Sequence, residues 1–334
     1  MAVSYIGMDV DCKMSELAVR RGGKLVTQLR VETTIPALRE ALQTIPKPRH
    51  LAIEEGSLTH WLVRNLDGAV DRLVACDPRR NAYIAKDGEK YDPLDAEKLS
   101  ELLEGGFLRE VYHSTDDNRV LFKRMVSHYH DRVINATRHV NKMRAFCLQY
   151  GLRPPKGALR DPRVRDQWLQ ELPNRSLAEL LGLRWQSMDI ARQDSVLARG
   201  LIQEHAKGYS IIRCWQSVPG VGPIRAMTLF AYLDTPHRFA NRSKLYKYCG
   251  AGLERRSSGS DRQGRPKKGR LRLCRNVNRR LKNVVFGATL SAIRQGGNIF
   301  GEDYERMVAK GMRPCNARHA VARKILRVMM GMWK

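Results

Sequence analysis

The chain has 334 residues, 43% of them hydrophobic, and carries 60 Lys and Arg against 34 Asp and Glu, a net charge of +26 at pH 7. That hydrophobic share excludes a wholly disordered chain, and the length suggests about two domains. So basic a chain usually binds a polyanion, most often nucleic acid, whereas no apolar run approaches the ~18 residues that span a bilayer.

Residues 1–112 have nearly balanced charge, with 16 Lys and Arg against 18 Asp and Glu. The pattern predicts strands over 3–10, 14–20 and 24–32, followed by alternating helices and strands. The expected helices cover 35–45, 58–66 and 92–106, and the expected strands cover 50–55 and 69–77. This order is typical of an RNase H-like α/β layer, so we predict a first domain over 1–112.

The middle region, 113–213, is predicted to be helical. Over 117–150, apolar residues are spaced alternately by four and three, which indicates one long helix with a coiled-coil seam. The seam is formed by Phe122, Val126, Tyr129, Val133, Ala136, Val140, Met143, Cys147 and Tyr150. It can pack on a second subunit or on another helix of the same chain, and residues 176–213 could form the return arm of a helical hairpin.

A third region, 214–334, is predicted to be mostly helical. Residues 113–334 carry 44 Lys and Arg against 16 Asp and Glu, a net charge of +28. This excess indicates that the binding of a polyanion is concentrated outside the first domain. The seven cysteines include no Cys-x-x-Cys pair, so neither a zinc site nor a disulfide framework is expected. The N-terminus lacks the basic start and apolar core of a signal peptide, and we expect a cytoplasmic protein.

Four carboxylates are candidates for a catalytic site. Asp9 and Glu54 end predicted strands, and Asp92 and Asp95 are spaced to share one face of a helix. Converging carboxylates need a divalent cation, and hard oxygen ligands favour Mg²⁺, which can assist cleavage of a phosphodiester. Asp11 competes with Asp9. Glu55 competes with Glu54, since neighbouring strand residues face opposite sides. Asp92 could also simply cap its helix.

Two features of the third region suggest contact with phosphates. The turn Pro-Gly-Val-Gly-Pro at 219–223, with Gly220 and Gly222, precedes a helix and resembles a helix-hairpin-helix phosphate loop; a tight turn between packed helices is the alternative. Residues 255–282 hold twelve basic residues and one acid, with a Gly-containing first half that predicts a loop or hairpin and a second half that predicts a helix. The candidate phosphate ligands are Arg255, Arg256, Lys267, Lys268, Arg270, Arg272, Arg275, Arg279 and Arg280.

Three blocks in the first domain, GMDVDCK (7–13), IEEGS (53–57) and DPRRNAYIAKDGEKYDPLDAEKL (77–99), resemble those of the DEDD transposases of the insertion sequence 110 family, relatives of the Piv invertase. The resemblance places the four acids on Asp9, Glu54, Asp92 and Asp95, with Tyr91 at a position where Thr is usual. It implies a RuvC-like first domain that uses Mg²⁺.

The span 217–285 resembles the C-terminal transposase domain of the same family, including Tyr248, Gly259, Asn278 and Leu281. This resemblance implies that Ser258 is a nucleophile that becomes covalently joined to DNA, with Ser257 and Ser260 as alternatives in register. The family's G-L pair is interrupted here over 250–253.

The resemblance further implies a bacterial, nucleoid-associated recombinase acting on donor and target DNA. Several members use a structured bridge RNA as a guide, and protomers of a dimer or tetramer share a composite site. Three alternatives stay open: a RuvC-like nuclease without a covalent intermediate, a Piv-like invertase without RNA, and a non-enzymatic nucleic-acid packaging protein.

Overall fold

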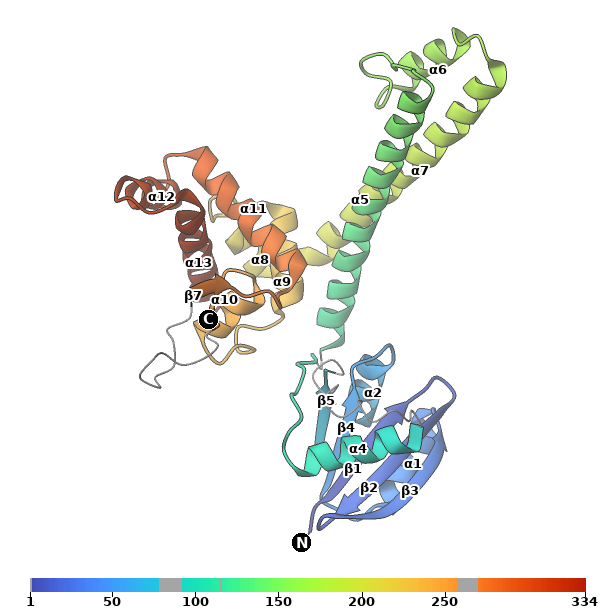
Figure 1. The fold of residues 1–334 in the computed structure, drawn as a ribbon, viewed down its shortest axis with the longest axis vertical. Coiled ribbons are helices and arrows are strands. Elements are labelled where there is room, and N and C mark those ends of the chain that lie inside the picture. Colours follow the sequence, from blue (N-terminus) through green and yellow to red (C-terminus); the bar gives the residue numbers. More distant parts are fainter. Residues whose placement is uncertain (1, 78–91, 115, 257–269) are drawn as a thin grey trace, which may run out of the picture. The chain divides into compact units, whose positions relative to one another are not determined.

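The computed structural model describes residues 2–77, 92–114, 116–256 and 270–334. The chain separates into two compact units, 1–115 and 116–334 (Figure 1). The first is a mixed α/β layer and the second is mostly helical, which confirms the predicted order of structural classes along the chain. No helix in the described ranges is long and apolar enough to cross a membrane.

A five-stranded sheet forms the centre of the first unit. Its strands are β1 (Ser4–Val10), β2 (Met14–Arg21), β3 (Lys24–Glu32), β4 (Arg49–Glu54) and β5 (Arg72–Cys76). The spatial order is β3-β2-β1-β4-β5. The first three strands pair antiparallel, whereas β4 runs parallel to β1 and β5 runs parallel to β4. All five strands were predicted from sequence to within a few residues.

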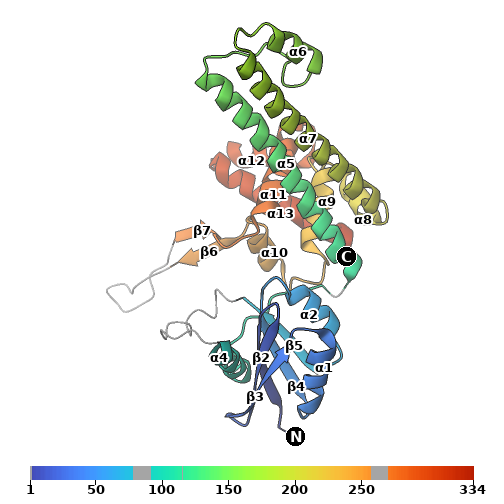
Figure 2. The ribbon, with the colours of Figure 1, turned by 90° about the vertical axis from the view of Figure 1, so that its right-hand side faces the viewer.

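Helices cover both faces of this sheet (Figure 2). On one face, α1 (Ile35–Thr44) and α2 (Thr59–Leu66) bury Leu38, Leu42, Leu62 and Leu66 against alternate strand residues such as Ile6 and Ile53. On the other face, α4 (Asp92–Glu104) packs Leu99 and Leu103 on Ala52, Val74 and Cys76. Successive residues of a central strand therefore face alternately the layer of α1 and α2 and the layer of α4.

The second unit begins with a helical hairpin. Helix α5 (Asp117–Gln149) starts at Asp116, whose carboxylate accepts the backbone N–H groups of Asn118 and Arg119. After the short helix α6 (Pro162–Gln170), α7 (Arg175–Ala206) returns alongside α5, as both views show (Figures 1 and 2). The partner of α5 in this structure is therefore a helix of its own chain.

The heptad positions of α5 do not form one uniformly buried seam. Phe122 and Val126 belong to the core of the C-terminal helices, whereas Met143 and Cys147 belong to a separate cluster with α7. Val133 is 37% exposed and Tyr150 is 57% exposed. The heptad spacing predicted the length of the helix, but its apolar residues are divided between two cores.

The remaining elements form a helical domain around Trp215, whose indole N–H donates to the Met329 carbonyl at 2.8 Å. They are α8 (Ser210–Trp215), α9 (Pro223–Leu233), α10 (Arg242–Tyr248), β6 (Leu253–Arg256), β7 (Arg270–Leu273), α11 (Arg279–Gln295), α12 (Ile299–Ala309) and α13 (Pro314–Trp333). The predicted basic helix over the second half of 255–282 is wrong for 270–273. These residues pair with β6, and α11 begins only after Asn278, whose side chain accepts the Leu281 N–H.

Candidate functional site

Asp9 and Glu54 lie at the same edge of the sheet and face the same side. In the parallel pair β1 and β4, Met8 lies opposite Ile53, and Asp9 and Glu54 are the next residues of the two strands. Met8 and Ile53 belong to the core beneath α1 and α2. Because strand residues alternate, Asp9 and Glu54 point toward the face that α4 covers.

Helix α4 lies directly on β1 at Gly7. A side-chain Cβ at Gly7 would overlap the Ala96 carbonyl oxygen and lie 2.5 Å from the amide nitrogen of Ser100. Only glycine permits this approach, which brings the α4 backbone to the strand two residues before Asp9. The glycine of the Gly-Met-Asp block is therefore a packing residue that supports the carboxylate edge.

The two flanks of α4 carry acids with different surroundings. Glu97 forms an ion pair with Arg20 at 3.4 Å, and Arg20 is the register partner of Tyr5 near the start of β1. Residues 95 and 97 are separated by about 200° around a helix, so Asp95 projects from the opposite flank. That flank faces the end of β1 that carries Asp9. Asp95 is exposed, and Asp92 is the first residue of the helix.

The competing acids are placed differently. Strand β1 ends at Val10, and the exposed Asp11 lies in the following turn, where its carboxylate accepts the Lys13 backbone N–H at 3.3 Å. Backbone hydrogen bonds from Cys12 and Lys13 lower the pKa of Asp11. Glu55 follows the last residue of β4, and its backbone N–H donates to the Cys76 carbonyl. By alternation it faces the side opposite to Glu54.

One acid at this edge was not among the predicted residues. Glu16 of β2 is the direct register partner of Asp9, so the two side chains share a face. Arg30 of β3, 3.3 Å from Glu16, offsets the repulsion between the neighbouring carboxylates. The sequence signal for Glu16 was its position in a predicted strand, but the pairing register was needed to place it opposite Asp9.

The chemistry of this donor set is suited to a hard cation. Asp9, Glu54 and Asp95 supply only carboxylate oxygens, which Mg²⁺ prefers. Within the described residues, no group of three or more His, Cys, Asp or Glu side chains is gathered closely enough to hold a metal ion.

The turn between α8 and α9 uses its two glycines differently. Gly220 has φ +82°, and a Cβ there would overlap the Ala288 carbonyl oxygen and lie 2.8 Å from the amide nitrogen of Ala292, so it serves the close packing of the turn on α11. Its carbonyl accepts a hydrogen bond from Arg225 at 2.6 Å. Gly222 is exposed with nothing near its Cβ position, and it begins α9 as the N-cap residue.

The predicted phosphate ligands fall into three groups. Lys267 and Lys268 lie outside the described residues, as does the predicted nucleophile Ser258, and Arg255, Arg256 and Arg270 lie in the strands on either side of this segment in sequence. The exposed ones are Arg272, Arg275 and Arg279. Arg280 instead donates to Asp131 at 2.8 Å and to the Ser127 carbonyl at 3.1 Å, which ties α11 to α5.

A second buried contact joins α5 to the C-terminal helices. The Arg119 guanidinium lies 3.3 Å from the Phe230 ring centroid and pairs with Asp234 at 3.2 Å, and both partners of the pair are about 10% exposed. Nearby, the His130 ring bonds the Thr228 hydroxyl at 2.9 Å, and burial lowers the pKa of His130. These contacts join residues roughly a hundred positions apart, so no local spacing indicated them.

Comparison with known proteins adds two kinds of similarity. Residues 213–305, from the end of α8 into α12, match the family model described as "Transposase IS116/IS110/IS902 family". Over 98% of its length the chain is 26% identical to a protein named "Putative transposase y4pF/y4sB" from Sinorhizobium fredii (strain NBRC 101917 / NGR234), and the alignment covers 83% of that relative.

A second relative is the protein named "Transposase for insertion sequence element IS1111A" from Coxiella burnetii (strain RSA 493 / Nine Mile phase I). It is 24% identical over 219 residues, which cover 61% of this chain and 56% of that protein. Both named relatives are thus transposases, and the family model matches the region that contains the paired strands β6 and β7.

Proposed function

We propose, from the premise that this chain is an insertion-sequence transposase of the IS110/IS116/IS902 family, that it cuts and rejoins DNA through a carboxylate site on its first unit and a serine nucleophile in its second. The observation that carries the proposal is the meeting of Asp9 and Glu54 at one sheet edge beneath the helix that begins with Asp92 and carries Asp95.

An RNase H-like, specifically RuvC-like, identity for the first unit is part of the proposal. It is supported by three antiparallel strands followed by two parallel strands in the order β3-β2-β1-β4-β5. In this arrangement Asp9, near the end of the central strand β1, lies beside Glu54 at the end of β4. Helix α4 packs on the face of the sheet toward which both acids point. Nucleases need acids from separate elements at one edge, because each carboxylate then contributes to one shared site.

Asp9, Glu54, Asp92 and Asp95 are the residues that would hold Mg²⁺. When bound, the ion would neutralise the carboxylates and stabilise negative charge on a phosphodiester during its cleavage. Around it, Arg30 keeps Glu16 paired, and the Glu97–Arg20 pair holds α4 by its other flank. The protein's part in this scheme would be to place Asp9 and Glu54 on neighbouring strand ends despite their mutual repulsion.

The covalent step is assigned to Ser258. Its Oγ would attack a DNA phosphorus, forming a serine–phosphate ester while the bond to a deoxyribose oxygen breaks and that oxygen takes up a proton. Attack by a deoxyribose hydroxyl of another strand would then form the new phosphodiester and return the proton to the serine. In sequence, β6 and β7 lie on either side of the segment that contains Ser258, and β7 carries the exposed Arg272, which favours approach of a phosphate.

Guidance by a bridge RNA is the finer part of the proposal. Its support is the net charge of +28 over residues 113–334, which would suit an RNA together with two DNA duplexes. The test is to express the gene with its flanking DNA, purify the protein in high salt and sequence the bound nucleic acid. One discrete RNA mapping to the flanks is expected, whereas only heterogeneous RNA would favour an invertase that reads DNA directly.

The test of the serine is trapping of a covalent protein–DNA adduct on a radiolabelled insertion-sequence end, with and without Mg²⁺. Ser258→Ala should abolish the adduct and strand joining, and Ser257→Ala and Ser260→Ala are matched controls that should retain both. Cleavage that persists in Ser258→Ala without an adduct would identify a RuvC-like nuclease instead. Unchanged nucleic-acid binding and no cleavage by any form would point to a packaging protein.

A further inference from the structure

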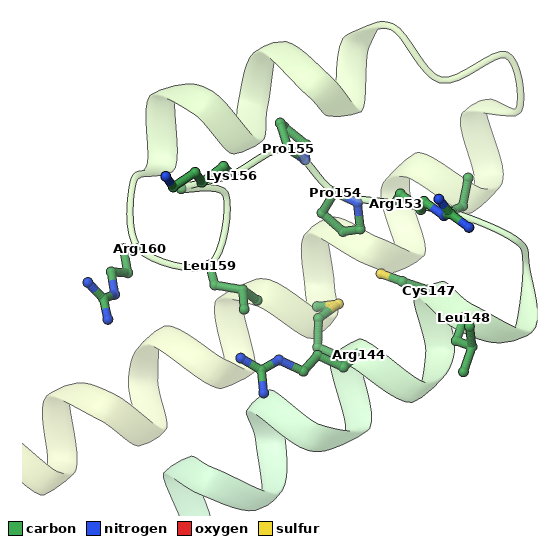
Figure 3. A pocket seen from close by; sticks show the side chains of 12 residues that line it. Arg144, Cys147, Leu148, Arg153, Pro154, Pro155, Lys156, Leu159 and Arg160 are labelled. Carbon is green, nitrogen blue, oxygen red and sulfur yellow. The ribbon is translucent and has the colours of Figure 1, made fainter.

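The tip of the helical hairpin contains a pocket that none of the proposed chemistry uses. Its volume is about 790 Å³, and it lies between the last turns of α5 and the loop at 151–161 that leads to α6 (Figure 3). Such a volume falls within the range of about 300–1,000 Å³ that is usual for ligand sites. The pocket lies within the second unit, so its shape depends on the hairpin alone.

The inner wall of the pocket is apolar. Met143 and Cys147 of α5 line it and are 1% and 2% exposed. Pro154 and Leu159 line it from the loop. Proline and leucine carry no hydrogen-bonding side-chain groups, so this wall accepts a flat apolar surface rather than a hydrated ion.

The rim of the pocket is cationic. Arg144, Arg153, Lys156 and Arg160 line it and are exposed, and no carboxylate does so. None of the four forms an ion pair with another described residue. The nearest acid in sequence, Asp161, is engaged as the N-cap of α6, where it accepts the Arg163 N–H.

The charge around the tip extends beyond the pocket. Residues 132–160 contain seven Lys and Arg and no Asp or Glu. An occupant must therefore combine a flat apolar part with several negative charges. A nucleotide has this composition, because its base can insert against the apolar wall and stack on a guanidinium plane while the flanking phosphates contact the rim.

We infer that the hairpin tip binds an unpaired nucleotide of the DNA on which the transposase acts, with the base in the pocket and the adjacent phosphates on Arg144, Arg153 and Lys156. The inference rests on the transposase activity for the identity of its ligand, but it is independent of the serine chemistry. Single-stranded rather than duplex DNA is specified, since a paired base has no face free to enter a pocket.

The test uses the full-length protein and a single-stranded DNA oligonucleotide with one central 5-iododeoxyuridine, irradiated and digested so that the linked residues are identified by mass spectrometry. We expect crosslinks within 143–160, and at least a tenfold lower yield there in the triple variant Arg144→Gln, Arg153→Gln, Lys156→Gln. The salt dependence of single-strand binding should also fall by about two in slope, since each phosphate contact contributes about 0.7.

The matched control is Arg138→Gln with Arg175→Gln, which removes exposed charge from α5 and α7 outside the pocket and should leave the crosslink yield unchanged. A second variant, Leu148→Glu, alters a lining residue that is 80% exposed, so the fold should tolerate it while the crosslink is lost.

The inference is overturned if an abasic competitor displaces the probe as well as the intact strand does, or if duplex DNA crosslinks at 143–160 equally well. Exclusive crosslinking of an RNA strand of the same sequence would overturn the assignment to DNA. The covalent serine adduct is measured in the same samples, so a failure of the pocket with the adduct present is distinguishable from a failure of the proposed function.

Discussion

Gly7 of β1 and Ala96 of α4 are in backbone contact, so close that any side chain at Gly7 would overlap the Ala96 carbonyl oxygen. This contact sets the height of α4 above the sheet and therefore the position of its acidic N-terminal turn relative to Asp9. A residue with no side chain thus controls the geometry of the proposed carboxylate site.

Gly7→Ala should lower the free energy of unfolding by about 1–3 kcal/mol, since the added methyl group must displace α4. DNA cleavage should fall further than stability alone explains, because the displaced helix carries Asp92 and Asp95. Urea unfolding and cleavage of a labelled insertion-sequence end measure the two effects. Gly56→Ala is the matched control, with open space around its Cβ position. Equal stability of the two variants would contradict the packing role of Gly7.

The two flanks of α4 give a second test. Asp95→Asn should reduce the rate of DNA cleavage by at least a hundredfold with little change in stability, because the variant loses an exposed carboxylate of the proposed Mg²⁺ site. Glu97→Gln, two residues away on the opposite flank, removes an ion pair with Arg20 and should leave cleavage within about threefold. Both rates are measured over a range of Mg²⁺ concentrations. Comparable losses from the two variants would show that the flanks do not differ in function.

The turn before α9 separates packing from phosphate contact. Gly220→Ala should destabilise the protein by about 2 kcal/mol or more, since φ is +82° and a methyl group would meet α11. Gly222→Ala should change stability by at most about 1 kcal/mol, because its Cβ position is open. If the N-terminus of α9 contacts DNA phosphate, Gly222→Ala should still weaken binding in a fluorescence anisotropy titration. Stability lost equally in both variants would rule out this division of roles.

His130 makes the second unit sensitive to acid. Its pKa is lowered from 6.5 by burial and then by Arg280, while Asp131 acts in the opposite direction. Below about pH 6.5 the unfolded chain therefore binds more protons at this position than the folded one, so stability falls as the pH drops and is constant above that value. His319 of α13, with a pKa lowered by burial, Arg323 and Lys282, adds in the same direction.

Urea unfolding at pH 7.5 and pH 5.5, followed by tryptophan fluorescence, measures this loss. One proton contributes a slope of at most about 1.4 kcal/mol per pH unit. His130→Gln should reduce the difference between the two pH values, and His128→Gln, an exposed neighbour on the same helix, should not. A pH dependence unchanged in His130→Gln would assign the acid sensitivity to other groups.

Much of the fold was predictable because its signals are local. The strands over 3–32 are short, are rich in β-branched residues and are separated by polar or Gly-containing turns, and the 33-residue helix α5 has a heptad pattern and an acidic N-cap. The strand assigned to 270–273 was mistaken for helix, since a short basic run with no Gly or Pro has no periodicity that distinguishes the two. Its partner β6, fourteen or more residues earlier, decided its conformation.

The candidate site was predicted less completely. Asp9, Glu54, Asp92 and Asp95 were chosen by type, spacing and resemblance, but Glu16 was not, because only the β1–β2 register places it opposite Asp9. Of the rim of the hairpin pocket, only Arg144 was noted in the sequence, as a basic residue between seam positions, and the other rim residues lie in the loop after the seam. That Arg144 and Lys156 line one pocket depends on the loop folding back over the end of α5.

The amino-acid sequence by itself determined the class of each region, the charge division near residue 112, and the length of α5, because hydrophobic period and charge act over a few neighbouring residues. Tertiary structure alone decided that α5 packs on α7 of its own chain, that Gly220 serves packing on α11, and that Asp9 and Glu54 meet beneath α4. These outcomes depend on strand register and close backbone approach between distant segments, whose energies come from contacts that no local pattern contains.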